Sequence, residues 1–563
     1  MLDLMNPAAK ADIDVTTLRG RRAVHRFERT SVGDVFERLT WSYPDQVAIT
    51  GWEGAYGEEA FARVTYREAD ETANRVAHAL AAAGLAPGDR VLLFCENSVE
   101  AYLTKIGVAK AGMVAVPLNP NLATDVVTHL IELTEPRFAI VDAELWPRAQ
   151  HAFDATDLAV GATITIGGGP VAGSPSFGGL IAEEPATEPD VEIHGDDIWE
   201  LLFTSGTTSL PKGVMVSHSS THLAALNFAL SLTRGLRHEC DLRLAVFLPL
   251  IYHVTDQIFT FSAFLAGGSL IVGRRPAPGP VVQALAAERA TAVWAGSPQF
   301  VTGLVAELDE HPELDVSALE VLVYGWGALA PATLDELVKH CGDLVTFGIF
   351  GQTEAIACHR FWPTKWPDLH RRTAPAVNYV GMPSPLLSSE VVDETGEPVR
   401  GEPGEAVYRS PIMTAGYYRN PEATAEAFRG GWFHSGDSVE IPPGAVDEDG
   451  LRIMVDRYKD IVKSGGENVS SMRVEAVLMT HPDVARAAVV GLPHERWGEA
   501  VTAVVVPQPG AVPVEADVLA YCRERLAGFE TPKRIVVADA LPETVGGKVL
   551  KYKLRAEHAG LYA

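Results

Sequence analysis

The hydrophobic residues of this chain form short apolar runs that alternate with segments of helical periodicity. Residues 63–85, RVTYREADETANRVAHALAAAGL, predict a short strand and then an amphipathic helix. DRVLLFCENS at 89–98 predicts a buried strand, VEAYLTKIGVAKAGM at 99–113 predicts a helix, and the same order returns at 319–342. This alternation indicates a mostly parallel α/β sheet with ligands at the carboxyl ends of its strands.

The pattern changes near residue 455. Residues 451–493 predict a strand, a turn, a strand, a glycine turn, a helix and a strand, and the remaining length suits a small α+β domain. We therefore predict an N-terminal domain at 1–455 and a C-terminal domain at 456–563. The segment between them, MVDRYKD, is short and polar, which favours a hinge over a long linker.

Composition narrows the class of protein. At 563 residues the chain is too long for one core, and its formal net charge of −27 argues against nucleic acid as a partner. The five cysteines lie far apart without a CxxC pair, which argues against a disulfide framework or a zinc site. The first residues lack the basic and apolar regions of a signal peptide, so a cytoplasmic location is expected. The apolar run at 258–273 has 16 residues, fewer than the ~20 that span a bilayer, so we assign it to the core and expect no membrane contact.

The stretch LLFTSGTTSLPKGVMVSH at 201–218 combines hydroxyls, glycine and lysine. Gly206 and Lys212 have the spacing of a P-loop, but Pro211 stands at its second glycine and Gly213 at its Ser or Thr. Proline has no amide to offer a phosphate, and glycine has no hydroxyl for magnesium, so a kinase or GTPase loop is excluded. A flexible phosphate cradle fits the remaining residues, and a solvated Ser/Thr-rich turn is the alternative.

Several motifs carry a family resemblance. TSGTTSLPKG at 204–213 resembles the phosphate-loop signature of the adenylate-forming superfamily of AMP-dependent synthetases and ligases, and the chain is most similar to its acyl- and aryl-CoA synthetase branch. Four further segments resemble the family's motifs in the family's order: FGQTE at 350–354, GWFHSGD at 431–437, VDRYKDIVKSGGENV at 455–469 and LPETVGGKVLKYKLR at 541–555. Ser209, Phe350 and Glu543 depart from the residues commoner there. The resemblance implies an α/β fold with a large N-terminal domain of mostly parallel sheets and a small, mobile C-terminal α+β domain that turns about Lys459.

The resemblance also implies ATP, Mg²⁺ and CoA, with four catalytic residues. Lys212 would hold the departing phosphates, Thr353 the α-phosphate and Glu354 the metal ion, while Lys548 would bridge the carboxylate and the α-phosphate. We expect Glu354 in a strand-to-helix turn, where an acid that favours a helix N-terminus is the alternative. Lys548 could equally belong to a solvated basic patch. The implied nucleotide-binding residues are Thr204, Ser205, Gly206, Thr207, Thr208, Lys212, Gly327, Ala328, Phe350, Gly351, Gln352, Thr353, Asp437, Arg457, Lys459 and Lys548.

The acid and the thiol have their own implied residues. His253 would separate the acid pocket from the thiol tunnel, although a lone histidine is more often structural. Trp326 and Ile349 stand where smaller residues are common in the family, so both are expected to shorten the pocket in favour of a short or aromatic acid. Gly465 and Gly466 would let CoA pass close to the backbone, or could form an ordinary tight turn.

Four function classes remain open. The first is a ligase that adenylates a small or aromatic acid, releases pyrophosphate and transfers the acyl group to CoA. The second loads a carrier protein, and the third activates nitrite with ATP to convert an aromatic amine to a diazo compound in secondary metabolism. The fourth is a nucleotide-binding protein that has lost catalysis. The expected partners are the small-molecule acid, ATP and CoA, and a homodimer is left open as the assembly.

Overall fold

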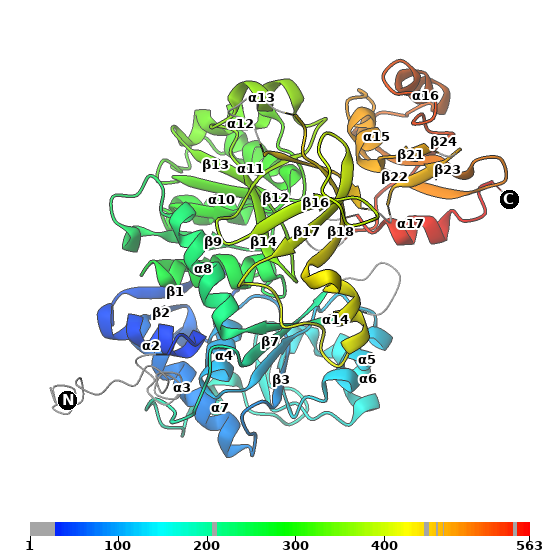
Figure 1. Ribbon diagram of the computed structural model, residues 1–563. Helices are drawn as coiled ribbons and strands as arrows, with labels where there is room; N and C mark the ends of the chain where they lie inside the picture. The colour runs from blue at the N-terminus through cyan, green and yellow to red at the C-terminus, as the bar shows by residue number, and fades with distance from the viewer. Residues whose placement is uncertain are drawn as a thin grey trace, which may run out of the picture.

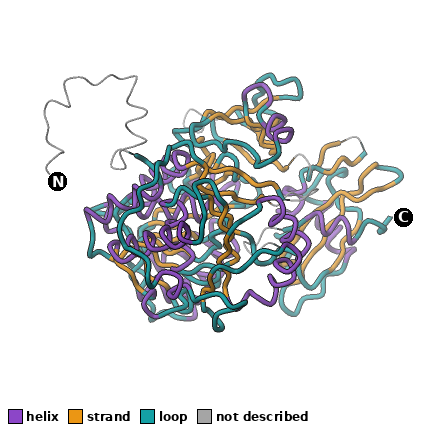
Figure 2. The backbone as a smooth tube through the Cα atoms, turned by 90° about the horizontal axis from the view of Figure 1, so that it is seen from below, coloured by secondary structure: helices purple, strands orange, loops and turns teal. Residues whose placement is uncertain are grey.

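The computed structural model describes residues 29–204, 211–443, 450–457, 460–465, 467–543 and 549–562. Its elements form a large N-terminal part, built on two sheets, and a smaller C-terminal part, built on a third sheet (Figure 1). In Figure 2 the C-terminal strands and helices lie to one side of the large part. The predicted fold class is confirmed.

A six-stranded sheet contains the two strands that flank the predicted phosphate loop. Its strands are parallel except for the last, which runs antiparallel to its neighbour. In spatial order they are β6 (Ala162–Ile164), β5 (Phe138–Asp142), β3 (Arg90–Phe94), β4 (Val114–Pro117), β7 (Ile198–Thr204) and β8 (Lys212–Ser217).

A thirteen-stranded sheet forms the centre of the molecule. It is parallel from β13 to β1, and its β13–β14, β14–β15 and β15–β19 pairs are antiparallel. In spatial order its strands are β16 (Ser388–Val392), β17 (Pro403–Arg409), β18 (Phe433–Glu440), β19 (Arg452–Arg457), β15 (Tyr379–Pro383), β14 (Ile356–Phe361), β13 (Val345–Gln352), β12 (Val321–Gly325), β11 (Ala292–Trp294), β9 (Arg243–Val246), β10 (Ser269–Val272), β1 (Val47–Gly51) and β2 (Arg63–Thr65).

The described residues of the C-terminal part form a five-stranded sheet. The long hairpin of β22 (Val484–His494) and β23 (Gly498–Pro507) is joined by β20 (Val462–Ser464), β21 (Glu467–Val469) and β24 (Arg534–Val537). Helices α15 (Ser471–Leu478), α16 (Glu515–Arg523) and α17 (Lys551–Glu557) complete it. The strands and the helix predicted for 451–493 are present as β19, β20, α15 and β22, whereas β21, which precedes the helix, was not predicted.

Helices cover the two large sheets, and the buried apolar residues of this part form several clusters. The largest core contains residues of both sheets and most of the buried side chains of the predicted core run at 258–273, whose Ile271 packs in a second cluster. The main covering helices are α2 (Val32–Ser42), α3 (Tyr66–Ala82), α4 (Val99–Lys110), α5 (Thr124–Thr134), α6 (Trp146–Thr156), α8 (His218–Leu232), α9 (Phe261–Leu265), α10 (Pro278–Ala287), α11 (Pro298–Glu310) and α12 (Pro331–Cys341). The shorter helices are α7 (Phe177–Ile181), α13 (Pro367–Thr373) and α14 (Pro421–Ala427). Within the described residues, no helix has the length and apolarity needed to cross a lipid bilayer.

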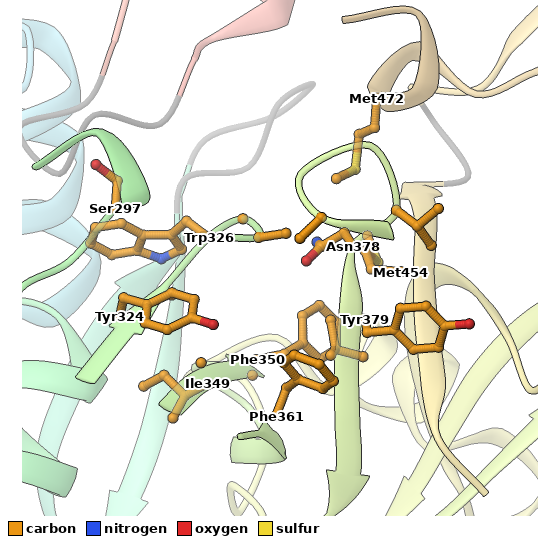
Figure 3. Close-up of a pocket in the computed structure, with 18 of the residues that line it drawn as sticks. Ser297, Tyr324, Trp326, Ile349, Phe350, Phe361, Asn378, Tyr379, Met454 and Met472 are labelled. Atoms are coloured by element: carbon orange, nitrogen blue, oxygen red, sulfur yellow. The ribbon is translucent and has the colours of Figure 1, made fainter. Parts of the chain in front are cut away.

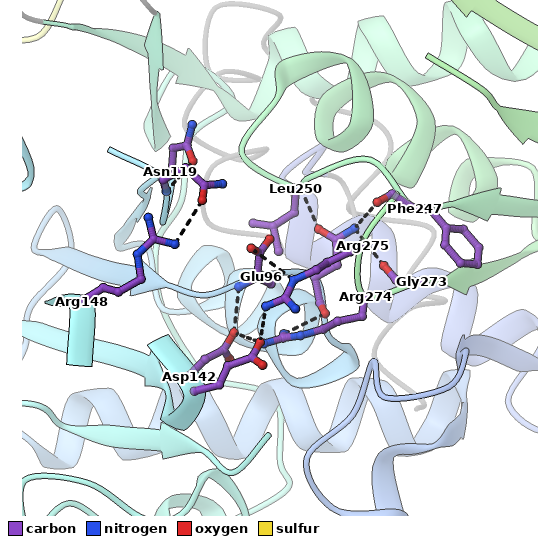
Figure 4. Close-up of polar contacts among 12 residues, drawn as sticks. Glu96, Asn119, Asp142, Arg148, Phe247, Leu250, Gly273, Arg274 and Arg275 are labelled. Atoms are coloured by element: carbon purple, nitrogen blue, oxygen red, sulfur yellow. Dashed lines mark hydrogen bonds and ion pairs between the residues drawn. The ribbon is translucent and has the colours of Figure 1, made fainter. Parts of the chain in front are cut away.

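A buried ion cluster ties the two large sheets together (Figure 4). Arg274, just after β10, donates to the Asp142 carboxylate at the end of β5 over 2.6 Å and also pairs with Glu144. Asp142 is fully buried, and its burial raises its pKa to about 6 against the opposing effect of Arg274. The ion pair between the buried Asp142 carboxylate and Arg274 therefore joins the ends of β5 and β10.

Candidate active site

A cavity of about 320 Å³ lies where the ends of β12 and β13 meet β15, β19 and the C-terminal part. In Figure 3, Trp326, Tyr324 and Ile349 stand on one side, Asn378, Tyr379 and Met454 on the other, and Phe350 between them. This position agrees with the expectation that ligands bind at the carboxyl ends of parallel strands. The predicted residues that line the cavity are His253, Trp326, Gly327, Ala328, Ile349, Phe350, Gly351 and Arg457.

One wall of the cavity is a cluster of tryptophans. The Trp326 ring meets Trp294 edge-on at 5.5 Å between centroids, and Trp294 stacks on Phe259 at 5.0 Å. Gly325 and Gly296 leave the room for these rings, because a Cβ on either would lie 3.1 Å from an indole atom. The wall is therefore large, rigid and apolar at the place where Trp326 was expected to shorten the pocket.

Trp326 has an unusual backbone. Its φ is +63°, in the left-handed region that favours glycine, and its side chain is 42% exposed. Left-handed backbone on a bulky residue costs of order 1–3 kcal/mol and persists only where the surroundings impose it. The conformation projects the indole over the cavity.

His253 and Thr353 contact each other. The Thr353 hydroxyl and His253 Nδ1 lie 3.1 Å apart, while His253 Nε2 is buried without a hydrogen-bond partner among the described residues. Burial lowers the pKa of His253 to about 3, so its ring is neutral at physiological pH. His253 comes directly before a π-helix at Val254–Thr260, and not at the end of a strand, because β9 stops at Val246.

Three polar residues with predicted nucleotide contacts form one hydrogen-bonded group. Asp437 on β18 and Arg457 on β19 are register partners, and their Oδ1 and Nε atoms lie 3.4 Å apart. Gln352, at the end of β13, donates to Asp437 Oδ2 over 2.5 Å. Asp437 is 1% exposed, so the carboxylate is held in one orientation beside the cavity-lining Arg457.

Glu354 lies in a different turn from the one predicted. The turn joins β13 to the antiparallel β14 and not to a helix, so the strand-to-helix expectation is wrong. The segment that follows, AIACHRF, contains Ile and Phe, which are common in strands. Without a helix N-terminus, the helix-acid alternative for Glu354 is also wrong.

Glu354 accepts a hydrogen bond from a residue that the sequence did not indicate. The Tyr417 hydroxyl donates to Glu354 Oε1 over 2.8 Å. Burial raises the pKa of Glu354, and the Tyr417 bond only partly opposes this. Lys212 Nζ lies 4.8 Å from the centre of the Tyr417 ring. Tyr417 therefore connects the predicted metal-binding and phosphate-binding residues.

The phosphate segment connects two antiparallel strands. Thr204 ends β7 and pairs in register with Lys212, the first residue of β8. A P-loop joins a strand to a helix, so the topology gives a second reason why this loop is not one.

Several predicted residues lie outside the described parts of the chain: Ser205, Gly206, Thr207, Thr208, Lys459, Gly466 and Lys548. Gly465 is described, has a φ of +64° and donates its amide to the Trp497 carbonyl, but it does not line the cavity. Val549 and Lys551, which follow Lys548 in sequence, do line it.

Tyr417 and Lys551 are among the site and cavity residues that sequence reasoning missed. Tyr417 lies 63 positions from Glu354 in a segment, TAGYYRN, that reads only as a turn. Lys551 belongs to a cluster of basic residues that suggests a solvated surface, yet its Nζ lies 2.8 Å from Glu475 Oε1 on α15. Neither contact has a periodic signal, because each depends on the tertiary arrangement.

The residues present fit a magnesium ion held by one protein carboxylate. The described parts of the chain contain no group of three or more His, Cys, Asp or Glu side chains arranged around a metal. Glu354 has a raised pKa and no ion pair with a described lysine or arginine. A bound cation would therefore supply the positive charge that compensates this carboxylate. Mg²⁺ commonly takes one or two carboxylates, with phosphates and water as its other ligands.

Known proteins resemble this chain along most of its length. The family model for AMP-binding enzymes matches residues 36–418, and the model for the AMP-binding enzyme C-terminal domain matches 473–548. A feruloyl-CoA synthase of Amycolatopsis sp is 34% identical over 87% of this chain and 93% of that protein. A long-chain fatty acid–CoA ligase of Mycobacterium tuberculosis is 31% identical over 93% of this chain and 99% of that protein.

A solved structure provides a further comparison. ATP-bound MatB from Rhodopseudomonas palustris is 28% identical and superposes with a TM-score of 0.80 over 95% of this chain and 100% of that one. The apo form of the same protein, with the same coverage, has a TM-score of 0.68. The match extends through both parts of the molecule. The chain belongs to the AMP-binding enzyme family.

Proposed function

We propose that this enzyme joins a small or aromatic carboxylic acid to CoA in two steps. In the first, the carboxylate attacks the α-phosphorus of ATP, which gives an acyl-adenylate and releases pyrophosphate. In the second, the CoA thiol attacks the acyl carbon, which gives the thioester and releases AMP. Membership of the AMP-binding enzyme family supports an AMP-forming ligase of the acyl-CoA synthetase type, and argues against a binding protein without catalysis.

The observation that carries the proposal is the shared cavity. Phe350, Gly327 and Arg457, which were assigned to the nucleotide, line the same space as His253 and Trp326, which were assigned to the acid. A nucleotide beside Phe350 and Arg457 would leave the acid the space between Trp326 and Ile349. Both reactants would then meet near Thr353, which touches His253.

The protein groups have complementary tasks in the first step. The reaction brings a carboxylate to an anionic phosphate, so the site must supply positive charge without protonating the attacking oxygen. Lys212 and Lys548 would provide fixed cations, and Asp437 would accept the ribose hydroxyls with its orientation fixed by Gln352. The neutral ring of His253 fits a site that must not hold the acid as an ion pair.

Magnesium would be held by Glu354 and, when bound, would neutralise charge on the phosphates. Tyr417 keeps one oxygen of that carboxylate in place through its hydroxyl. Thr353 would donate its hydroxyl to the α-phosphate once that group replaces His253 as its partner.

The acid is inferred from the walls of the cavity. Trp326, Trp294 and Ile349 close the acid side with bulky groups, and the nucleotide shares the volume of about 320 Å³. Aromatic walls pack well against a flat aromatic ring. A long alkyl chain would have to displace the tryptophan wall.

The second step would need a different arrangement of the small domain. The superposition on ATP-bound MatB is better than on its apo form, which supports an adenylation pose for the present structure. We propose that the chain after Lys459 turns about this residue, which would carry the 541–555 segment away from the cavity and bring Gly465 and Gly466 to the incoming thiol, while Asp456 and Arg457 stay on β19 of the central sheet. A cytoplasmic location and a homodimeric assembly also stay predictions, the second open to sedimentation analysis.

A substrate panel tests the proposal. Purified enzyme with ATP, Mg²⁺ and CoA would be offered benzoates, cinnamates, short alkanoates and palmitate, with release of AMP and pyrophosphate as the readout. We expect turnover with aromatic or short acids and little with palmitate. Preference for palmitate would contradict the inferred acid class, and acid-dependent AMP release with nitrite and an arylamine, or with a carrier protein but not CoA, would contradict the acceptor.

A further inference from the structure

Three residues form a hydrogen-bonded relay between the small domain and the central sheet. Lys551, the first residue of α17, donates from Nζ to the Ser471 hydroxyl over 2.5 Å. Ser471, the first residue of α15, donates its hydroxyl to Asp456 Oδ2 over 2.6 Å, and its amide donates to the same oxygen over 2.7 Å. Asp456 lies on β19, the strand that also presents Arg457 to the cavity.

Domain rotation would affect the Lys551 contacts and the Asp456 contacts of the relay differently. Lys551 also pairs with Glu475, which accepts the Val489 amide over 2.7 Å, and all three lie after the predicted hinge. These contacts would survive rotation as a unit. The bonds from Ser471 to Asp456 cross from one side of the hinge to the other, so they would break.

The contact between Ser471 and Asp456 is buried, so breaking it should cost more free energy than breaking an exposed hydrogen bond. Ser471 and Asp456 are 0% and 2% exposed. Burial alone would lower the pKa of Lys551, but Glu475, Asp456 and Asp460 raise it above the ordinary lysine value, so the side chain is a cation. Separating Asp456 from the Ser471 donors and the nearby cation would leave its carboxylate with only the Arg457 amide among these groups.

We propose that Lys551, acting through Ser471 and Asp456, is a positioning residue that holds the small domain in the adenylation pose. The inference rests on the proposed function for its catalytic consequence. Lys551 is three residues after Lys548, and the intervening Val549 lines the cavity, so fixing the start of α17 fixes the neighbourhood of the predicted catalytic lysine. The relay serves acid activation and is released for thiol transfer.

The Ser471 amide provides a direct readout of the relay. As the first N–H of a helix it has no partner within α15, so its protection from hydrogen–deuterium exchange comes from Asp456. We expect at least ~10-fold faster exchange of this amide in Lys551→Met and Ser471→Ala than in the wild type, since one tenfold step matches a typical hydrogen bond. Lys551→Arg should restore protection, and Lys553→Met, on the exposed side of the same helix, should leave it unchanged.

Activity distinguishes positioning from general damage. Lys551→Met should slow acid-dependent ATP–pyrophosphate exchange by ~10–100-fold in kcat with little change in the KM for ATP, because misplaced groups lose rate and not binding. Conversion of synthetic acyl-adenylate and CoA to thioester should stay near the wild-type rate. Equal loss in both half-reactions, or equal loss in Lys553→Met, would overturn the proposal.

The two levels of inference fail separately. If the wild-type enzyme activates no acid, the proposed function is wrong, and exchange at the Ser471 amide still decides whether the relay exists. If that amide exchanges equally in wild type and variants, the relay is overturned whatever the activities. Should Lys551→Met fail to fold, Ser471→Ala decides, because it removes one hydroxyl and leaves the Lys551–Glu475 pair intact.

Discussion

Replacing Trp326 with glycine tests the acid pocket. The indole stands over the cavity and meets Trp294 and Tyr252 edge-on, at 5.5 and 6.3 Å between ring centroids. Its removal would open apolar space beside Ile349. We expect Trp326→Gly to accept longer acids than the wild type, because an added methylene would find a dry apolar surface.

Trp326→Gly should change the free energy of unfolding only slightly, because two effects oppose each other. Glycine adopts the φ of +63° freely, which recovers of order 1–3 kcal/mol of backbone strain. The two lost ring pairs contribute about 0.5–1.5 kcal/mol each. Because these magnitudes nearly cancel, and the indole is 42% exposed, the variant should unfold within about 2 kcal/mol of the wild type.

The assay compares kcat/KM along a homologous series of acids. Burying one methylene contributes about 0.8 kcal/mol, so each added methylene that enters the new space should raise the relative kcat/KM about fourfold. Trp326→Phe, which retains a ring, should shift the preference less, and Trp41→Ala, at a tryptophan 71% exposed on α2, should not shift it. An unchanged chain-length preference in folded Trp326→Gly would refute the placement of the acid.

Three further predictions concern the charged groups. Lys212→Ala should slow ATP–pyrophosphate exchange ~100-fold with every acid if the lysine stabilises the departing phosphates, and wild-type exchange would remove it from the site. Tyr417→Phe should cost ~10-fold in kcat and move the acid limb of the pH–rate profile to higher pH. The Tyr417 hydrogen bond lowers the pKa of Glu354, so its loss raises that pKa; an unmoved limb would contradict this. Arg274→Met should lower the free energy of unfolding by about 3–5 kcal/mol at pH 7, against about 0–1 kcal/mol for the 55% exposed Arg275→Met. The folded pKa of Asp142 is raised to about 6, so ionising this carboxyl costs stability as pH rises from about 4 to 6. Arg274 opposes the rise, so its loss should raise the pKa of Asp142 further, and the variant should go on losing stability above pH 6. Its deficit should therefore grow with pH; a deficit independent of pH would contradict the role of that pair.

The sequence indicated elements better than it indicated turns and contacts. The alternation of apolar runs and helical periodicity predicted β3, α4, β12 and α12, because each element is defined by local side-chain spacing. The hairpin after Glu354 was missed, since the αβ alternation favours a helix there and only β14 pairing in the central sheet selects a strand.

The candidate site shows the same division. Trp326 and Ile349 line the cavity because Trp326 directly follows β12 and Ile349 lies on β13, two strands whose neighbours are fixed by the parallel sheet. Tyr417 and Lys551 reach their partners across 63 and 76 residues of chain. Such contacts are set by how separate elements pack and leave no mark on local periodicity.

The central claim, adenylation of a carboxylic acid, is tested most directly by an oxygen-transfer measurement. A turned-over acid labelled with ¹⁸O in both carboxylate oxygens is converted with unlabelled ATP and CoA in unlabelled water, and the products are analysed by mass spectrometry. Attack of the carboxylate on the α-phosphorus, followed by thiol attack on the acyl carbon, predicts one ¹⁸O in AMP, one in the thioester and none in pyrophosphate. Label in inorganic phosphate or pyrophosphate, or unlabelled AMP, would contradict the account.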